Sequence, residues 1–322
     1  MIPEGRVREM PTNSFQPFLE RDFAKVSAKP IIDVASPLLI EVVNHATQAC
    51  RRCDVRAGQD AASGQSGEHL SPLMLYMHII EMADGLEVLV SNSCSGPAVP
   101  FLRSMLEALL SLEYMFQEDY KRRSLCWLCS YIHKRIEGYE LLDSTTNRGK
   151  ELRKVLKKEG SYGSGGYSSS SIRARLQKVL ASELATIEQE YKSQKKAQNR
   201  NPHWYSLFGG PKNLRDLAAK VSKVGYYDLL YRGWSSIMHV TDASRFLGKT
   251  SEGAPAFHQM RYPENLKDYT WLGVNFVVIS TAMIIQRFRP GEDLSPWYNT
   301  EVKPRLDYLR KVPVKINSRI EQ

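Results

Sequence analysis

The apolar residues of this chain recur at intervals of three and four, which is the spacing of one face of an α-helix. After Ser71-Pro72, for example, the apolar stripe consists of Leu73, Tyr76, Ile79, Ile80 and Ala83. No stretch alternates polar and apolar residues well enough to require a β-sheet. The pattern therefore predicts an all-α fold.

Short breaks separate the predicted helices, and this favours a bundle of neighbouring helices. We predict a first helix from Ser36-Pro37, because serine is a good N-cap and proline suits the first turn. Further helices are predicted from Ser71-Pro72, from Phe101, and from about Lys121 to Leu142. Long helices joined by short turns are typical of an up-down bundle, to which the remaining helices would add peripheral layers.

The breaks divide the chain into three predicted parts. Residues 1–35 contain four prolines and no sustained period, which indicates an irregular N-terminal arm. Residues 36–290 form the predicted bundle, interrupted by a flexible loop rich in Gly and Ser at 159–171. Residues 291–322 form a predicted C-terminal extension with a short helix near Val302 to Leu309.

Composition bounds the partners and the compartment that we expect. The net charge of +9 favours a polyanionic partner such as nucleic acid, although charge alone does not identify it. Five cysteines, an odd number, and an N-terminus without an apolar signal segment predict a cytoplasmic protein with free thiols. The apolar run from Trp271 to Ile285 is short and contains polar residues, so we predict a buried core helix and no membrane partner.

A polar stripe runs along one predicted helix, Tyr231 to Leu247, which reads YRGWSSIMHVTDASRFL. Its members occupy positions i, i+3, i+4 and i+7 and therefore share one face of the helix. They are Arg232, Ser235, Ser236 and His239. Burying such a stripe is costly unless other groups pair with it. The stripe therefore predicts either a structural hydrogen-bond network or a functional site.

A second polar pair, Arg103 and Glu107, lies on the helix from Phe101, where Glu107 is surrounded by apolar residues. The simpler interpretation is an i, i+4 salt bridge within that helix. The alternative is that the pair faces Arg232 and His239 across the bundle. Glu107 would then orient Arg232 or set the His239 tautomer, and Arg103 would add a second phosphate-binding cation. The rim of this pocket would be completed by Tyr231 and Ser235.

The Arg-x6-His spacing on a late helix resembles the Arg-x4-6-His signature of the HEPN superfamily, many of whose members are metal-independent ribonucleases of toxin and antiviral defence systems. The segments RSMLEALLSLEYM and YRGWSSIMHV look like those of an uncharacterised group of prokaryotic helical proteins near HEPN. The resemblance covers roughly residues 73–247.

This resemblance implies an endoribonuclease that needs neither a metal nor a cofactor. Neutral His239 would take the proton from an RNA 2′-hydroxyl, and Arg232 would hold the scissile phosphate. The resemblance also implies a homodimer with a composite site, and a cognate antitoxin or defence-system partner protein.

The alternative is a non-catalytic helical scaffold, or an RNA- or nucleotide-binding module. In that case Arg232 and His239 only bind phosphate or hold the fold. Gly233 favours this alternative, because HEPN nucleases usually carry a polar residue directly after the arginine. The convergence of the polar stripe on one face favours the enzyme.

Two CxxC pairs, Cys50-Cys53 and Cys126-Cys129, could suggest a zinc site. Both fall within predicted helices, and their separation is far from zinc-ribbon spacing. We therefore predict buried free thiols. The helical histidines are interpreted as surface or core-edge residues without a metal: His45, His78 and His133.

Overall fold

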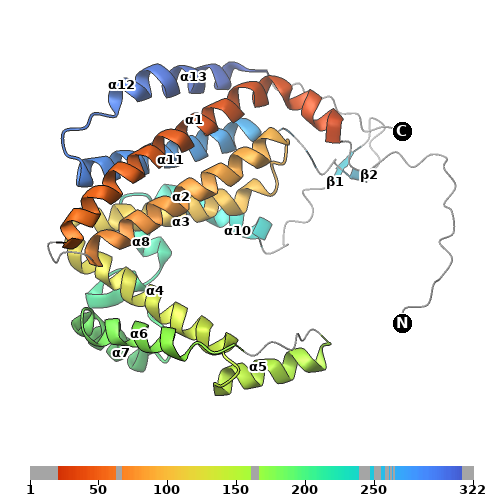
Figure 1. Cartoon of the computed structure of the whole chain (residues 1–322). Helices are drawn as coiled ribbons and strands as arrows, with labels where there is room; N and C mark the ends of the chain where they lie inside the picture. Colours follow the sequence, from red (N-terminus) through yellow and green to blue (C-terminus); the bar gives the residue numbers. More distant parts are fainter. Residues whose placement is uncertain are drawn as a thin grey trace, which may run out of the picture.

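The computed structural model describes residues 21–62, 67–160, 167–238, 247–249, 255–257, 261, 263 and 265–313. These residues form an all-α structure, which confirms the predicted fold class (Figure 1). Their β-structure is limited to one short antiparallel pair, β1 (Leu247–Lys249) and β2 (Pro255–Phe257).

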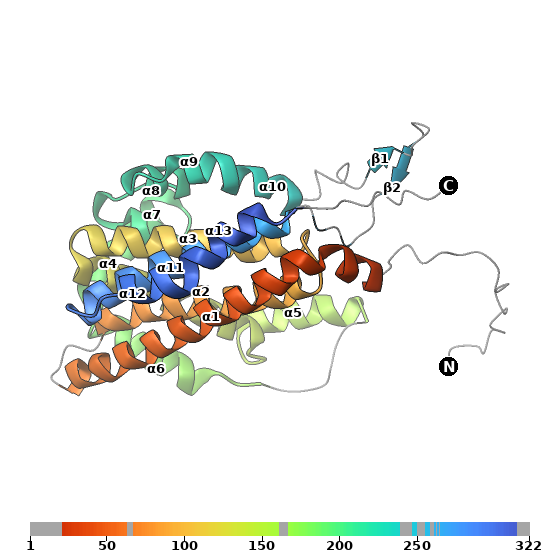
Figure 2. The same cartoon turned by 90° about the horizontal axis from the view of Figure 1, so that it is seen from above.

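Four helices form the main core. They are α1 (Arg21–Ala62), α2 (Gly67–Ser91), α3 (Ala98–Gln117) and α11 (Leu266–Phe288). Helix α2 contacts the other three, and α11 also packs against α1 and α3 (Figures 1 and 2). The helices approach closely at Gly273, where a Cβ atom would lie 2.4 Å from the Leu86 side chain. Glycine is therefore needed there for packing.

Helix α1 begins earlier than the sequence predicts. It runs from Arg21 without interruption through Pro30 and Pro37, so the irregular arm predicted for residues 1–35 is wrong from residue 21 onward. Residues 1–20 lie outside the described part. An interior proline costs a helix about 3 kcal/mol. Burial of apolar side chains on both sides of the prolines, including Ile31 and Leu38, offsets this cost.

A second, smaller core forms around α4 (Tyr120–Leu142), which leads away from the main bundle (Figure 1). Three elements pack against it: α6 (Ser170–Ala181), α7 (Ala185–Gln198) and the 3₁₀ turn η1 (Trp204–Gly209). Helix α5 (Asn147–Lys158) follows directly after α4. The molecule thus has two apolar cores, joined along α4.

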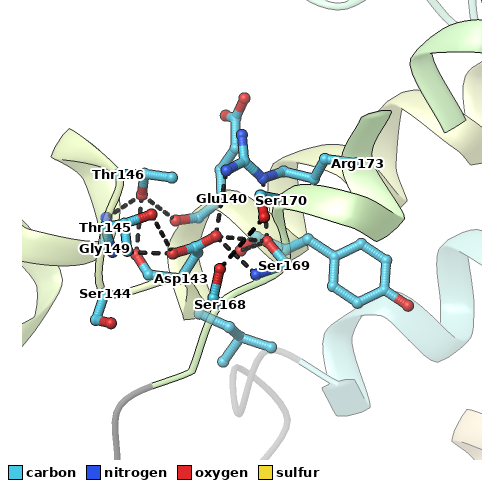
Figure 3. A network of polar contacts seen from close by, with 12 residues as sticks. Glu140, Asp143, Ser144, Thr145, Thr146, Gly149, Ser168, Ser169, Ser170 and Arg173 are labelled. Carbon is cyan, nitrogen blue, oxygen red and sulfur yellow. Dashed lines mark hydrogen bonds and ion pairs between the residues drawn. The ribbon is translucent and has the colours of Figure 1, made fainter. Parts of the chain in front are cut away.

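A buried carboxylate anchors the end of the loop that was predicted to be flexible at 159–171. Asp143, fully buried, accepts hydrogen bonds from the Ser169 backbone N–H at 2.8 Å and hydroxyl at 2.9 Å (Figure 3). It also accepts from Thr145 and Arg173. Residues 161–166 lie outside the described part, but residues 167–169 are held in place and Ser170 begins α6.

The C-terminal segment belongs to the bundle. It contains α12 (Ser295–Trp297), the π turn η4 (Tyr298–Val302) and α13 (Lys303–Lys311). Trp297 donates a hydrogen bond to Glu41 at 2.8 Å and stacks on His45, and Leu309 is buried in the main core. The predicted short helix is therefore confirmed, and as far as residue 313 the predicted C-terminal extension packs against the main core through its apolar side chains.

Among the described helices, α11 is the one long and apolar enough to cross a membrane by length and composition. Its most apolar window is 56% buried within the protein. This agrees with the core helix that the sequence predicts around Trp271 to Ile285.

Candidate functional site

A run of short helical elements passes along the side of α3 (Figure 2). It consists of α8 (Leu214–Lys220), α9 (Val224–Tyr226), the π turn η2 (Tyr227–Tyr231) and α10 (Arg232–Met238). Single π turns inside α-helices are uncommon and occur frequently at functional sites. This turn ends at Tyr231, which faces α3.

Tyr231 meets Arg103 in a close contact. The Arg103 guanidinium donates a hydrogen bond to the Tyr231 hydroxyl at 2.5 Å, and its central carbon lies 4.1 Å from the ring centroid. Arg103 Nε also lies 3.5 Å from Glu107 Oε1. The pair thus forms the i, i+4 salt bridge of the simpler interpretation. Arg103 also reaches Tyr231 on the neighbouring π turn, which is not the contact with Arg232 or His239 that the alternative predicts.

The Tyr231 phenol is partly buried, and its surroundings keep it protonated. Burial raises its pKa, the hydrogen bond from Arg103 lowers it, and the Glu107 carboxylate raises it again. The net effect is a pKa above the ordinary value, so the phenol is neutral at pH 7 and can donate a proton. Tyr227 stacks on its ring, and the Ser235 hydroxyl donates to its backbone carbonyl at 2.9 Å. Ser235 thus supports the helix here.

Arg232 lies at the surface beside this cluster. Its side chain is 68% exposed and forms a loose ion pair with Asp228 at 3.9 Å. Asp228 is shared with Arg215, at 3.2 Å. The prediction that Glu107 orients Arg232 is therefore wrong in this structure, because Glu107 pairs with Arg103 and Arg232 pairs with Asp228. His239 lies outside the described residues, so its predicted contact with Glu107 stays a prediction.

A pocket of about 650 Å³ lies close to this cluster, and the sequence did not predict it. It is formed by the ends of α3 and α4, by η1 with the loop after it, and by α8. Its aromatic side chains are Tyr114, Trp204, Tyr205 and Phe208. Burial is the largest cause of the raised pKa of Tyr205, and the nearby Glu107 and Tyr231 raise that pKa further. Tyr205 therefore lies between the pocket and the cluster.

Charges around the pocket are predominantly positive once existing pairs are considered. The lining carboxylate Glu118 pairs with Arg123 at 2.9 Å. The other, Asp216, accepts from the Asn213 side chain. The ammonium groups of Lys212 and Lys220 form no ion pair with any described residue. Aromatic rings beside free cations are suited to stacking a nucleobase and holding a phosphate.

The loop on the pocket's rim has an unusual backbone. Phe208 adopts φ of 57°, a left-handed conformation that bulky residues rarely take, and Arg122 lies 5.1 Å above its ring. A Cβ atom on Gly210 would lie 2.0 Å from the Tyr205 carbonyl oxygen. The sequence signal for this loop was the aromatic break NPHWYSLFGGPKN, which ends in a Gly-Gly-Pro turn.

The two CxxC pairs lie in different cores. Cys50 and Cys53 are buried in the main core, Cys126 and Cys129 in the smaller one, and none forms a disulfide. The prediction that these four cysteines are buried and form no disulfide is confirmed. One group of potential metal ligands does occur among the described residues, consisting of Cys129, His133 and Glu188.

Comparison with known proteins identifies a family whose function is unknown. The model of a family of unknown function, DUF5677, matches residues 69–254. This range contains both the Arg103–Tyr231 cluster and the pocket. No curated protein and no solved structure matches the chain.

Proposed function

We propose that this chain, which belongs to DUF5677, a family of unknown function, is an endoribonuclease. It would cleave RNA without a metal ion. The observation that carries the proposal is the Arg103–Tyr231 contact. It brings a cation, a neutral phenol and the Glu107 carboxylate together, directly beside Arg232 of the Arg-x6-His spacing.

These groups match the requirements of RNA cleavage through the 2′-hydroxyl. His239 would accept the 2′-hydroxyl proton, and the freed oxygen would attack the adjacent phosphorus, displacing the 5′-oxygen. Arg103 and Arg232 would bind the phosphate oxygens as negative charge develops. The protonated Tyr231 phenol would donate a proton to the leaving oxygen, which completes the balance.

The charge environment supports an RNA substrate. The ion pair of Arg232 with Asp228 is exposed and long, and such pairs contribute little free energy, so a phosphate can replace it. The pocket beside Tyr205 offers aromatic rings and the cations of Lys212 and Lys220 to a neighbouring nucleotide. The proposal includes a homodimer with a composite site, a role in toxin or antiphage defence, and a cognate antitoxin or defence-system partner.

A second candidate is an RNA- or nucleotide-binding module that does not cleave. The pairing of Arg232 with Asp228 instead of Glu107 favours this candidate, because the guanidinium is not fixed by the cluster. The two candidates make opposite predictions for His239→Ala. A catalytic His239 predicts lost cleavage with retained binding, whereas a purely structural His239 predicts a lower melting temperature.

The deciding experiment is cleavage of labelled total RNA and tRNA in EDTA. Wild type is compared with Arg232→Ala and His239→Ala, each checked for folding by circular dichroism. The matched control is Arg135→Ala, which like Arg232→Ala removes an exposed arginine, here one on α4 that donates to the Tyr139 hydroxyl at 2.6 Å. We expect cleavage by wild type and the control alone. Equal cleavage by all four proteins would refute the proposed site.

A further inference from the structure

Three potential metal ligands converge in the smaller core. Cys129 and His133 are one turn apart on α4, so their side chains lie on the same side of that helix. Glu188 reaches them from α7. His133 Nε2 lies 2.6 Å and Cys129 Sγ 3.7 Å from Glu188 Oε2, and all three ligand atoms lie within 4.8 Å of one another.

We propose that Cys129, His133 and Glu188 bind one divalent transition-metal ion of the zinc class. Thiolate, imidazole and carboxylate are the ligand types that zinc takes in proteins. Zinc–ligand bonds of about 2.0–2.3 Å place tetrahedral ligand atoms roughly 3.3–3.7 Å apart. The sulfur–oxygen distance already has this value, and the His133–Glu188 hydrogen bond must open by less than about 1 Å.

The surroundings position the ligands as metal sites require. His133 stacks on Tyr191 with ring centroids 4.0 Å apart and planes 5° apart, which fixes the imidazole plane. Lys192 holds the other Glu188 oxygen at 2.8 Å. Partners of this kind orient the ligands and tune metal affinity. The Cys129 side chain is fully buried, and the Glu188 side chain is 9% exposed, so water competes weakly.

Metal binding needs no oxidant or reductant, and every proton and charge involved can be accounted for. The Cys129 thiol releases its proton to solvent as the sulfur binds the ion. The His133 proton moves from Nε2 to Nδ1, which frees Nε2 for the metal. The thiolate and the Glu188 carboxylate then neutralise the two positive charges, and the fourth position takes a water molecule. The ion would tie α7 to α4.

A structural network without metal is the competing explanation. In that case Glu188 simply accepts from His133 and Lys192, and Cys129 packs as a small apolar residue. Two other histidine–carboxylate contacts in the described part of the chain, His69 with Glu68 and His78 with Glu81, are longer, at 3.9 Å. Neither of them joins a group of three potential ligands in the described residues. The cysteine therefore distinguishes this site.

The test is titration of the full-length, chelator-stripped protein with Co²⁺, followed by Zn²⁺. We expect one Co²⁺ per chain, a thiolate-to-cobalt charge-transfer absorption, and its loss on adding Zn²⁺. Cys129→Ser should abolish the absorption. Cys126→Ser is the matched control, since Cys126 is buried one turn away on the same helix and should leave the absorption unchanged. No absorption in the wild type, or absorption retained in Cys129→Ser, would overturn the proposal.

A second measurement guards against misfolding of the cysteine variant. Glu188→Gln keeps the shape of Glu188 but removes its charge and replaces one acceptor oxygen with a donor NH₂ group, and we expect Co²⁺ to bind on the order of 10- to 100-fold more weakly. At the same concentration, Zn²⁺ should raise the melting temperature of the wild type by more than that of Glu188→Gln. Equal Co²⁺ affinity in the two proteins would contradict carboxylate ligation. This site is separate from the Arg103–Tyr231 cluster, so its test does not depend on RNA cleavage.

Discussion

The Arg103 guanidinium lies 2.5 Å from the Tyr231 hydroxyl and 4.1 Å from the centre of its ring, although 128 positions separate the two residues. The contact links α3 to the π turn before α10. It is also the point at which two polar sequence motifs, one around Glu107 and one around Arg232, meet in space. The contribution of this contact to the free energy of unfolding can be measured without an activity assay.

We expect Arg103 and Tyr231 to be energetically coupled. The Arg103 side chain is only 19% exposed, so a cation over an aromatic ring should contribute about 0.5–2 kcal/mol. The measurement is a double-mutant cycle of Arg103→Ala and Tyr231→Ala by urea unfolding, since Tyr231→Phe would keep the ring that the cation contacts. The exposed pair Arg135 and Tyr139 serves as the control, with an expected coupling of less than about 1 kcal/mol. Coupling no larger than in this control would argue against a built site.

The fold class and much of the cluster were predictable because they depend on local periodicity. The three- and four-residue spacing gave the helices, and helical geometry alone placed Arg103 beside Glu107 on α3. The hypothesis was that this pair faces Arg232 and His239. The contact of Arg103 with Tyr231 was not predicted, because contacts between helices depend on packing that one sequence does not specify.

Other features were not predictable, since tertiary packing overrides the local signal. Ser36-Pro37 has the signature of a helix start, yet burial of its neighbours carries α1 through Pro37. The association of His133 with Glu188 joins α4 to α7, 55 positions apart, and only Cys129 was near enough in sequence to suggest a ligand. The pocket likewise requires two distant stretches of the chain, residues 114–126 and 204–220, to meet.

The pocket lysines should account for part of the salt dependence of RNA binding. Each phosphate contact on a single strand contributes about 0.7 to the slope of log affinity against log salt. We expect Lys212→Gln and Lys220→Gln each to reduce that slope by about this amount. Lys29→Gln on α1, where the lysine already pairs with Asp33, is the control and should leave the slope unchanged. The slope is measured by fluorescence anisotropy with a labelled single-stranded RNA.

A single methyl group on Gly210 should prevent the rim loop from packing closely against the Tyr205 backbone. Gly210→Ala places a Cβ atom 2.0 Å from the Tyr205 carbonyl oxygen, so we expect a loss of about 1–3 kcal/mol in unfolding free energy and weaker RNA binding. Gly138→Ala is the matched control, because its Cβ atom meets no atom within 4 Å. Gly138 lies inside α4, about one turn before its end, so that change should stabilise the protein by about 0.5–1 kcal/mol. Equal unfolding midpoints for the two variants would contradict this account of the loop.

Asp143 should make the protein less stable in acid. Hydrogen bonds from Thr145 and Ser169 hold its carboxylate pKa well below the ordinary value, despite an opposing effect of burial. The unfolded chain, with an Asp pKa near 3.9, therefore binds this proton more readily than the folded chain. The stabilisation is complete above about pH 5 and is lost progressively as the pH falls below about 4.

The measurement is urea unfolding of wild type and Asp143→Asn between pH 7 and pH 3. The variant should be less stable than the wild type at pH 7, because an amide cannot accept all the bonds in Figure 3. The difference between the two proteins should shrink below about pH 4, as the wild-type carboxylate loses its advantage. Asp33→Asn controls for general acid effects, since Asp33 is exposed and bonds only to Lys29 in the described structure. A constant difference between wild type and Asp143→Asn across this range would show that the charge of Asp143 does not stabilise the anchored loop.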